Sequence, residues 1–339
     1  MRLLISFIIL ILLAVGAVFS GTYFVNNEVG KPLSLSSSTI VTVTPGQAGK
    51  QVVSMLRNNG LTDIDPLVAK VWLKFLAPSR GPKAGTYQLM PSMSLQDAYQ
   101  HFVDGDEHQF EVSLIEGLTY SQWLDVLQHH EFIEFDIRDD AQAQLLAQWP
   151  HAELGEATSV EGILLADTYH FTANTKASVI LTRAMQAMTQ YLRDAWFSRA
   201  LTLPVDTPYD ALILASIIEK ETGVPHERPK IAGVFVNRLN ENMRLQTDPT
   251  VIYGIGEGFD GNITRTHLRQ KTPYNTYVIR GLPPTPIAMA GKPAIDAALQ
   301  PMQTDALYFV SRGDGTHQFS TNLEDHNKAV YQYQIKKQD

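Results

Sequence analysis

The N-terminal segment constrains the fold most, because the chain carries no charged residue from Leu3 to Val25. As a helix that rises about 1.5 Å per residue, a segment of this length crosses a bilayer core of about 30 Å. A cleaved signal peptide is the alternative, with Val18-Phe19-Ser20 as the cleavage site, but its apolar region usually spans only about 7 to 15 residues. The length therefore favours a retained transmembrane anchor over residues 3 to 25.

The charges beside this segment indicate its orientation. Arg2 and the amino terminus precede it, and Glu28 follows it. Because positive charge stays preferentially on the cytoplasmic side, the N-terminus is expected in the cytoplasm and residues 26 to 339 outside it. That placement argues against chemistry that depends on ATP or NAD.

The composition excludes several classes of protein. The net charge is -8, with 27 Lys and Arg against 35 Asp and Glu, whereas a nucleic-acid binder needs a basic surface. The absence of cysteine excludes disulfides, thiolate metal sites, cysteine nucleophiles and lipoprotein acylation. The ten histidines include no HExxH pair, and the adjacent His129 and His130 diverge. No metal and no cofactor is expected.

The remaining chain divides by pattern into a linker and two α+β parts. Residues 26 to 40 are Ser-rich and aperiodic, which indicates a linker. Strand, turn and amphipathic helix then recur, as in "AGTYQLMPSMSLQDAYQHFVDG", where Ser94 and Asp97 form a capping box. These units predict a compact α+β module over residues 41 to 107 and a larger mixed domain over residues 108 to 339.

One helix of the larger domain has sharply defined ends. Thr207 is its expected N-cap, with Pro208 at the first helical position and Asp210 at the third. The following "ALILASIIEKETG" is apolar on almost every side, which predicts a buried helix. Gly223 is the expected end, with Pro225 beyond it.

This helix carries two glutamates in its last turn. At about 100° per residue, Glu219 and Glu221 point to nearly opposite sides and cannot form a close dyad. Glu221 lies over Leu214, Ile217 and Ile218, the more apolar side. Burial and the negative end of the helix dipole favour its protonated form, which a general acid for glycosidic cleavage requires. The plain alternative is that Glu221 caps the helix while Glu219 pairs with an Arg or Lys.

Polar and aromatic residues gather downstream of this helix. Gln246 and Asp248 lie in a polar turn, and "TPYNTYVIRGLPPTPIA" brings Tyr274, Asn275 and Tyr277 together. Aromatic faces beside amides suit a carbohydrate, which offers apolar ring faces and many hydroxyls. These five residues are therefore candidates for binding a sugar.

Seven stretches together resemble the endolytic murein transglycosylases of the YceG-like family. They are "AGTYQL", "ASIIEKETG", "VFVNRL", "MRLQTDPTVIYG", "PYNTY", "GLPPTPIA" and "FSTNLEDHNKAV". The resemblance implies a membrane-anchored enzyme of the bacterial inner membrane, with its catalytic domain in the periplasm. It also implies a LysM-like subdomain over residues 41 to 107 and a YceG-like catalytic domain over residues 108 to 339.

The resemblance further implies a lyase reaction within peptidoglycan glycan strands. The bond between N-acetylmuramic acid and N-acetylglucosamine breaks, and a 1,6-anhydro end forms. One carboxylate can suffice, because the C6 hydroxyl of the sugar replaces the water that a second carboxylate would position. The family's catalytic residue matches Glu221, which leaves Glu219 a structural role. Asn322 joins the candidate substrate-binding residues, and penicillin-binding synthases are implied partners in ending nascent strands.

Two other functions stay open at this point. A hydrolytic muramidase would need a second carboxylate, for which Asp248 is the best-placed candidate. A non-catalytic scaffold would hold peptidoglycan through the LysM-like module. A serine or aspartic hydrolase is less favoured, because the chain has no GxSxG and no paired Asp motifs.

Overall fold

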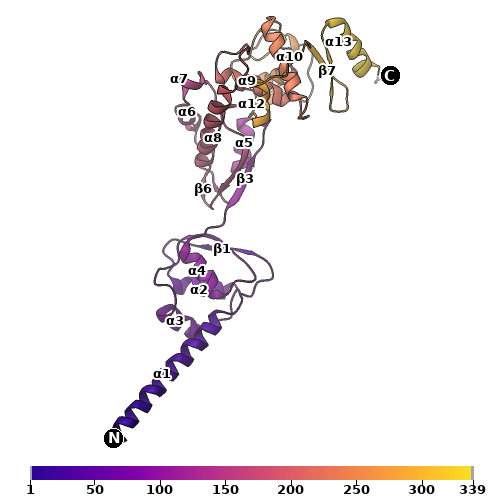
Figure 1. Ribbon diagram of the computed structural model, residues 1–339. Helices are drawn as coiled ribbons and strands as arrows, with labels where there is room; N and C mark the ends of the chain where they lie inside the picture. The colour runs from indigo at the N-terminus through magenta and orange to yellow at the C-terminus, as the bar shows by residue number, and fades with distance from the viewer. Residues whose placement is uncertain (1, 337–339) are drawn as a thin grey trace. The chain divides into compact units, whose positions relative to one another are not determined.

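The computed structural model describes residues 2–336 and shows a mixed α+β protein, as the sequence predicts. The chain folds into two compact units. The first comprises residues 1–110 and 171–173, and the second comprises residues 111–170 and 174–339. Figure 1 shows the elements of both units along the chain.

Unit 1 begins with a single continuous helix, α1 (Arg2–Val29), which is long and apolar enough to cross a membrane. Its last turn is buried in the core of the unit through Val25 and Val29, and Leu33 follows into the same core. Residues 26 to 40 were expected to form a linker, but the helix continues through their first four residues. The four-residue spacing of these apolar side chains explains the difference, because it places Val25 and Val29 on one helical face.

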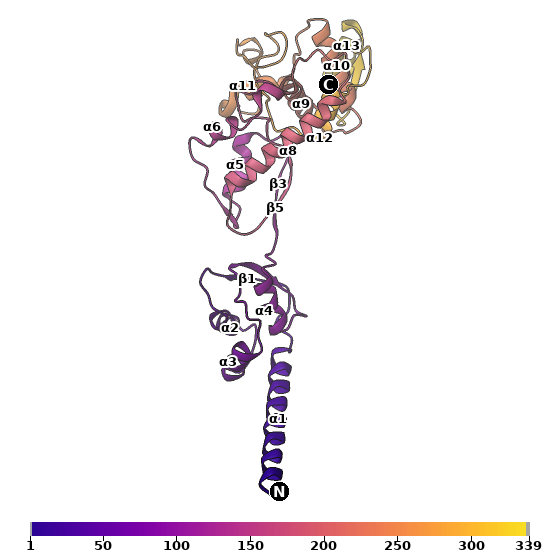
Figure 2. The same cartoon turned by 60° about the vertical axis from the view of Figure 1, so that its left-hand side comes forward.

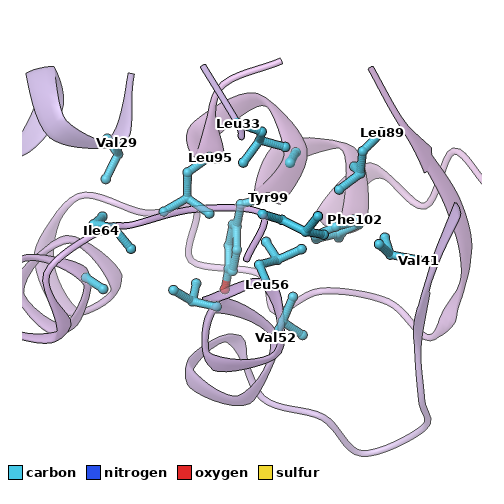
Figure 3. Close-up of a cluster of buried hydrophobic side chains, with 14 of the residues drawn as sticks. Val29, Leu33, Val41, Val52, Leu56, Ile64, Leu89, Leu95, Tyr99 and Phe102 are labelled. Atoms are coloured by element: carbon cyan, nitrogen blue, oxygen red, sulfur yellow. The ribbon is translucent and has the colours of Figure 1, made fainter. Parts of the chain in front are cut away.

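The rest of unit 1 is a small α+β module. Its two strands pair antiparallel, with Thr39 opposite Leu89 and Val43 opposite Gly85. Ser94 and Asp97 form the predicted capping box. The helices cover a core that Figure 3 shows in part, with Tyr99 and Phe102 among its side chains. The LysM-like character of this module stays a prediction. Its elements are β1 (Thr39–Val43), α2 (Gly49–Asn58), α3 (Pro66–Phe75), β2 (Gly85–Leu89) and α4 (Leu95–Asp104).

As far as residue 336, unit 2 is mainly helical, with three short two-stranded sheets. Strand β3 pairs with β5, β4 runs parallel to β6, and β7 forms an antiparallel hairpin with β8. The first elements are β3 (Phe110–Leu114), α5 (Tyr120–Gln128), β4 (Ile133–Glu134), α6 (Ala141–Leu146), α7 (His151–Leu154), β5 (Asp167–Phe171), β6 (Thr175–Lys176) and α8 (Ala177–Phe197). Later elements are α9 (Pro208–Glu221), α10 (Arg228–Asn240), α11 (Asp248–Ile255), α12 (Lys292–Leu299), β7 (Tyr308–Ser311), β8 (His317–Ser320) and α13 (Leu323–Val330). A π-helical turn (Tyr331–Ile335) follows α13, and two 3-10 turns lie at Gly256–Gly258 and His267–Arg269.

Helix α9 is the centre of unit 2. It packs against α8, α10, α11 and α12, and Figure 2 shows α9 and α12 between α8 and α10. Its start is as predicted, because the Thr207 hydroxyl accepts from the Asp210 N–H and Pro208 opens the helix. Its end is also as predicted, since Thr222 is the extended C-cap (φ -148, ψ 131) and Gly223, the expected stop, lies just beyond it. Glu221 is therefore the last helical residue.

Candidate active site

The last turn of α9 presents its two glutamates to different surroundings, as the helical spacing predicts. Glu219 accepts from the Gly291 N–H at 3.0 Å and from Arg228 Nη2 at 3.4 Å, and its side chain is 5% exposed. Burial raises the pKa of Glu219, although these two donors oppose the rise. Glu219 thus joins the end of α9 to the starts of α10 and α12.

Glu221 lines an open cavity of about 550 Å³ in unit 2. Its Oε1 accepts a hydrogen bond from the Thr247 hydroxyl. Burial raises the pKa of Glu221, and the negative charge of Asp248 adds to the rise. The Thr247 hydrogen bond and the charges of His317 and Arg238 act in the opposite direction. A carboxyl in these surroundings holds its proton to higher pH and can donate it into the cavity.

The partner of Glu221 is fixed by a network of three threonines. The Thr247 N–H donates to Thr276 Oγ1 at 3.0 Å, and the Thr250 hydroxyl donates to the Thr247 carbonyl at 2.8 Å. The preceding residue, Gln246, has a left-handed backbone (φ 51) that side-chain-bearing residues adopt uncommonly. Strained backbone of this kind occurs preferentially at functional sites. The turn therefore holds the Thr247 hydroxyl at the Glu221 carboxyl.

Arg238 and His317 are two basic side chains in the walls of the cavity. Arg238 is 7% exposed and donates to the backbone carbonyls of Leu307 (2.6 Å), Leu245 (2.8 Å) and Arg244 (3.2 Å). These bonds join α10 to the start of the β7–β8 hairpin and to the turn before Thr247. A buried guanidinium thus both shapes the cavity and places positive charge near Glu221.

His317 is held by a carboxylate from outside the cavity lining. Glu227 is 7% exposed, accepts the His317 N–H at 3.0 Å and lies 2.8 Å from its ring Nδ1. Burial would raise the pKa of Glu227, but the bonds from His317 more than offset it and lower that pKa. The carboxylate thereby fixes the imidazole of His317 in the wall of the cavity.

The structure brings some of the predicted binding residues together. Gln246, Asp248 and Tyr277 line the cavity with Glu221. The Tyr277 hydroxyl donates to Asp248 Oδ1 at 2.6 Å, so the second carboxylate in the cavity already has a partner. Asp248 also opens helix α11, where its charge is stabilised by the helix dipole.

The other three predicted binding residues do not line this cavity. The Tyr274 hydroxyl lies 2.8 Å from Thr285 Oγ1. Asn275 is 1% exposed, and its amide donates to the Gln270 carbonyl at 2.7 Å. Asn322 is the N-cap of α13, where it accepts from a backbone N–H. Each has a structural partner, and their roles in binding stay predictions.

Sequence reasoning missed the lining residues that the C-terminal hairpin and helix supply. His317, His326 and Tyr308 line the cavity, and the rings of Tyr308 and His326 stack with centroids 5.1 Å apart. A signal was present, because His317 and His326 flank or lie within the stretch "FSTNLEDHNKAV". The spacing of these histidines does not match that of metal ligands. A search of the sequence for metal-binding histidines alone therefore does not find them.

A further buried carboxyl lies away from the cavity. Glu161 is 5% exposed and accepts from the Tyr120 N–H at 3.0 Å and the Tyr253 hydroxyl at 3.3 Å. Burial raises its pKa to about 7. It lies at the start of α5 and beside α11, so its protonation affects the packing of both.

Glu161→Gln is expected to change how stability depends on pH. Because the folded pKa is raised, the stability that Glu161 contributes is fully present below about pH 4.5 and is lost as the pH rises through about 7. Between pH 5 and pH 8 the wild type should therefore lose roughly 2 to 3 kcal/mol more unfolding free energy than Glu161→Gln. Urea unfolding in detergent measures this. Glu131→Gln, at an exposed position, is the control and should follow the wild type; equal pH dependence in all three proteins would refute the prediction.

Comparisons with known proteins agree along most of the chain. A model of the YceG-like family matches residues 41–332. The "Endolytic murein transglycosylase" of Bacillus subtilis (strain 168) is 30% identical over 331 residues, which cover 93% of this chain and 91% of that protein. The protein of the same description from Streptococcus pneumoniae serotype 2 is 27% identical, and the alignment covers 97% of this chain but 64% of that relative. A crystal structure of a YceG-like protein from Listeria monocytogenes aligns with a TM-score of 0.57 and 28% identity, covering 87% of this chain and 99% of that one.

Proposed function

The chain belongs to the YceG-like family, and from that premise we propose that it is a peptidoglycan lytic transglycosylase that cuts glycan strands internally. The observation that carries the proposal is the state of the two carboxyls in the cavity. Burial raises the pKa of Glu221 and favours its protonated form, whereas Asp248 is engaged by the Tyr277 hydroxyl. One free acid fits a reaction whose nucleophile comes from the substrate.

In the proposed reaction Glu221 acts twice. Its proton passes to the glycosidic oxygen as the bond from C1 of N-acetylmuramic acid to N-acetylglucosamine breaks. The resulting carboxylate removes the proton of the C6 hydroxyl, whose oxygen bonds to C1 and closes the 1,6-anhydro ring. Glu221 ends protonated, and no water is consumed. The Thr247 hydroxyl and the nearby charge of Arg238 stabilise the carboxylate between the two steps.

The hydrogen bond from the Thr247 hydroxyl to Glu221 can be tested by substitution of Thr247. Thr247→Val removes the donated hydrogen bond at nearly constant volume, so the pKa of Glu221 should rise further and the carboxylate intermediate should be less stable. We expect kcat to fall by about tenfold, the equivalent of about 1.4 kcal/mol, and the basic limb of the pH–rate profile to move to higher pH. Thr247→Ser keeps the hydroxyl and should retain most activity. Equal losses in both variants would show that the hydroxyl is not what matters.

Internal cleavage distinguishes this proposal from a peptidoglycan-binding scaffold. Full-length protein in detergent is incubated with isolated long glycan strands, and the strand-length distribution is followed by chromatography. Internal cutting shortens the mean length early, before disaccharides accumulate. Unchanged strands that still bind the protein would support the scaffold and overturn the proposal.

The apolar helix supports a proposed location. We place α1 across the bacterial inner membrane as a single span, with the N-terminus cytoplasmic and residues beyond the helix in the periplasm, where peptidoglycan lies. There the enzyme would end nascent strands, with penicillin-binding synthases as partners. A reporter fused to either end, active on one side of the membrane alone, tests the orientation.

A further inference from the structure

The outer face of α3 exposes an unusual amount of apolar surface. Leu67, Val71 and Phe75 follow one another at four-residue intervals and are 71%, 43% and 68% exposed. Leu76 at the C-cap is 36% exposed. Between residues 30 and 110, the other large apolar side chains of comparable exposure are Ile40 and Met90 alone. Apolar residues grouped in this way mark a contact surface, whereas scattered ones do not. The side chains of Leu67, Val71 and Phe75 are called the α3 stripe below.

Two lysines border the α3 stripe. Lys70 and Lys74 lie between its members in the sequence, and Lys74 Nζ is 5.0 Å from the centroid of the Phe75 ring. From residue 66 to residue 75 the helix contains no acidic residue. Lysines beside exposed apolar side chains suit a surface that is apolar inside and anionic outside, because their long stems reach from one to the other.

The inner face of α3 fixes its position beside α1. Ala69 and Trp72 are buried in the same core as Val25 and Val29, the two buried residues of α1. Figures 1 and 2 both show α3 next to the last turns of α1. Since an apolar helix from Leu3 to Val25 spans about 34 Å, Val25 lies close to the edge of a bilayer core of about 30 Å. The contact with α1 therefore holds α3 at the level of the membrane surface.

We propose that α3 lies in the headgroup region of the membrane that α1 crosses. The α3 stripe enters the boundary with the acyl chains, and Lys70 and Lys74 bind the phosphates of anionic lipids. Unit 1 then contacts the membrane at two places, the span and the surface helix, which fixes its tilt on the bilayer. The inference rests on the proposed membrane span and is independent of the reaction at Glu221.

Site-directed spin labelling tests the depth of α3 directly, because the chain has no native cysteine. Single cysteines replace Leu67, Val71 or Phe75 in the full-length protein, which is placed in vesicles of phosphatidylethanolamine and phosphatidylglycerol. Ile9→Cys in α1 is the deep control. Asp106→Cys, at a side chain that is 72% exposed beyond α4, is the aqueous control. Collisions of each nitroxide with oxygen and with a water-soluble nickel chelate report its depth.

Labels on the α3 stripe should collide more with oxygen than with the chelate, to a degree between the two controls. Lys70→Glu combined with Lys74→Glu should shift these labels towards water without moving the Ile9 label. Stripe labels that match Asp106 while Ile9 stays deep would overturn the inference and leave the span intact. Stripe labels shielded from both reagents would mean that protein covers the α3 stripe, which would also overturn the inference. A label at position 9 that is exposed to water would show that α1 does not span the membrane, and would overturn the inference as well.

Discussion

Glu221→Gln should reduce glycan cleavage by about 10²- to 10⁴-fold, the usual contribution of a general acid and base. The amide has the shape of the carboxyl and can accept the Thr247 hydrogen bond, but it cannot give a proton to the leaving oxygen or take one from C6. Because burial raises the pKa of Glu221 and favours its neutral form, the neutral amide is tolerated there and introduces no unpaired charge. The thermal midpoint should therefore stay near that of the wild type.

Glu219→Gln is the matched control two residues earlier on the same helix. It removes the charge that faces Arg228 while the amide oxygen still accepts from Gly291. We expect a lower thermal midpoint and at least a tenth of wild-type cleavage, since the change affects the support of α9 and leaves the cavity acid in place. Cleavage by Glu221→Gln at the wild-type rate would show that Glu221 is not the catalytic acid. A complete loss of cleavage in Glu219→Gln alone would assign that role to Glu219.

Arg238→Met should produce the second largest effect, because this side chain serves both stability and the charge balance of the site. Loss of its donors removes the guanidinium hydrogen bonds to the backbone carbonyls of Leu307, Leu245 and Arg244, at about 1 to 3 kcal/mol for each carbonyl that water cannot reach. Removal of the positive charge should also raise the pKa of Glu221 further. The basic limb of the pH–rate profile is then expected to move to higher pH.

Arg238→Lys separates these two contributions. It keeps a positive charge but loses the planar fork that reaches three carbonyls. We expect a lower unfolding free energy with a basic limb close to that of the wild type. If both variants shift the limb equally, the charge of Arg238 is not what opposes the raised pKa of Glu221. Unfolding by urea and initial cleavage rates from pH 5 to pH 9 measure the two effects.

Local patterns predicted the parts of the site that lie within one helix. The caps at Thr207 and Pro208 and the divergence of Glu219 from Glu221 follow from neighbouring residues and the helical period. The sequence predicts that Glu221 is more buried than Glu219, but the Glu219 side chain is itself only 5% exposed. Its neighbours along α9 are less apolar, but α10 and α12 cover it, and a single helix does not reveal what packs on it.

Contacts between distant segments account for what the sequence did not predict. Glu227 and His317 are 90 residues apart, and nothing in either segment indicates that they meet. Arg238 lies in the last turn of α10, where an exposed charge is the ordinary expectation, yet it donates to the carbonyl of Leu307, 69 residues later. Val29 and Leu33 lie in the stretch predicted as a linker. Most side chains of their core come from residues after 40, so the local pattern does not show that these two residues are buried.

Cleavage in water enriched in ¹⁸O shows most directly whether the C6 hydroxyl or water is the nucleophile at C1. Glycan strands are digested by the full-length enzyme, and the new ends are weighed by mass spectrometry, with Glu221→Gln as the blank. An intramolecular attack by the C6 hydroxyl predicts anhydro ends that are lighter than reducing ends by one water and contain no ¹⁸O. Reducing ends that carry ¹⁸O would show that water is the nucleophile, and would make the protein a hydrolytic muramidase.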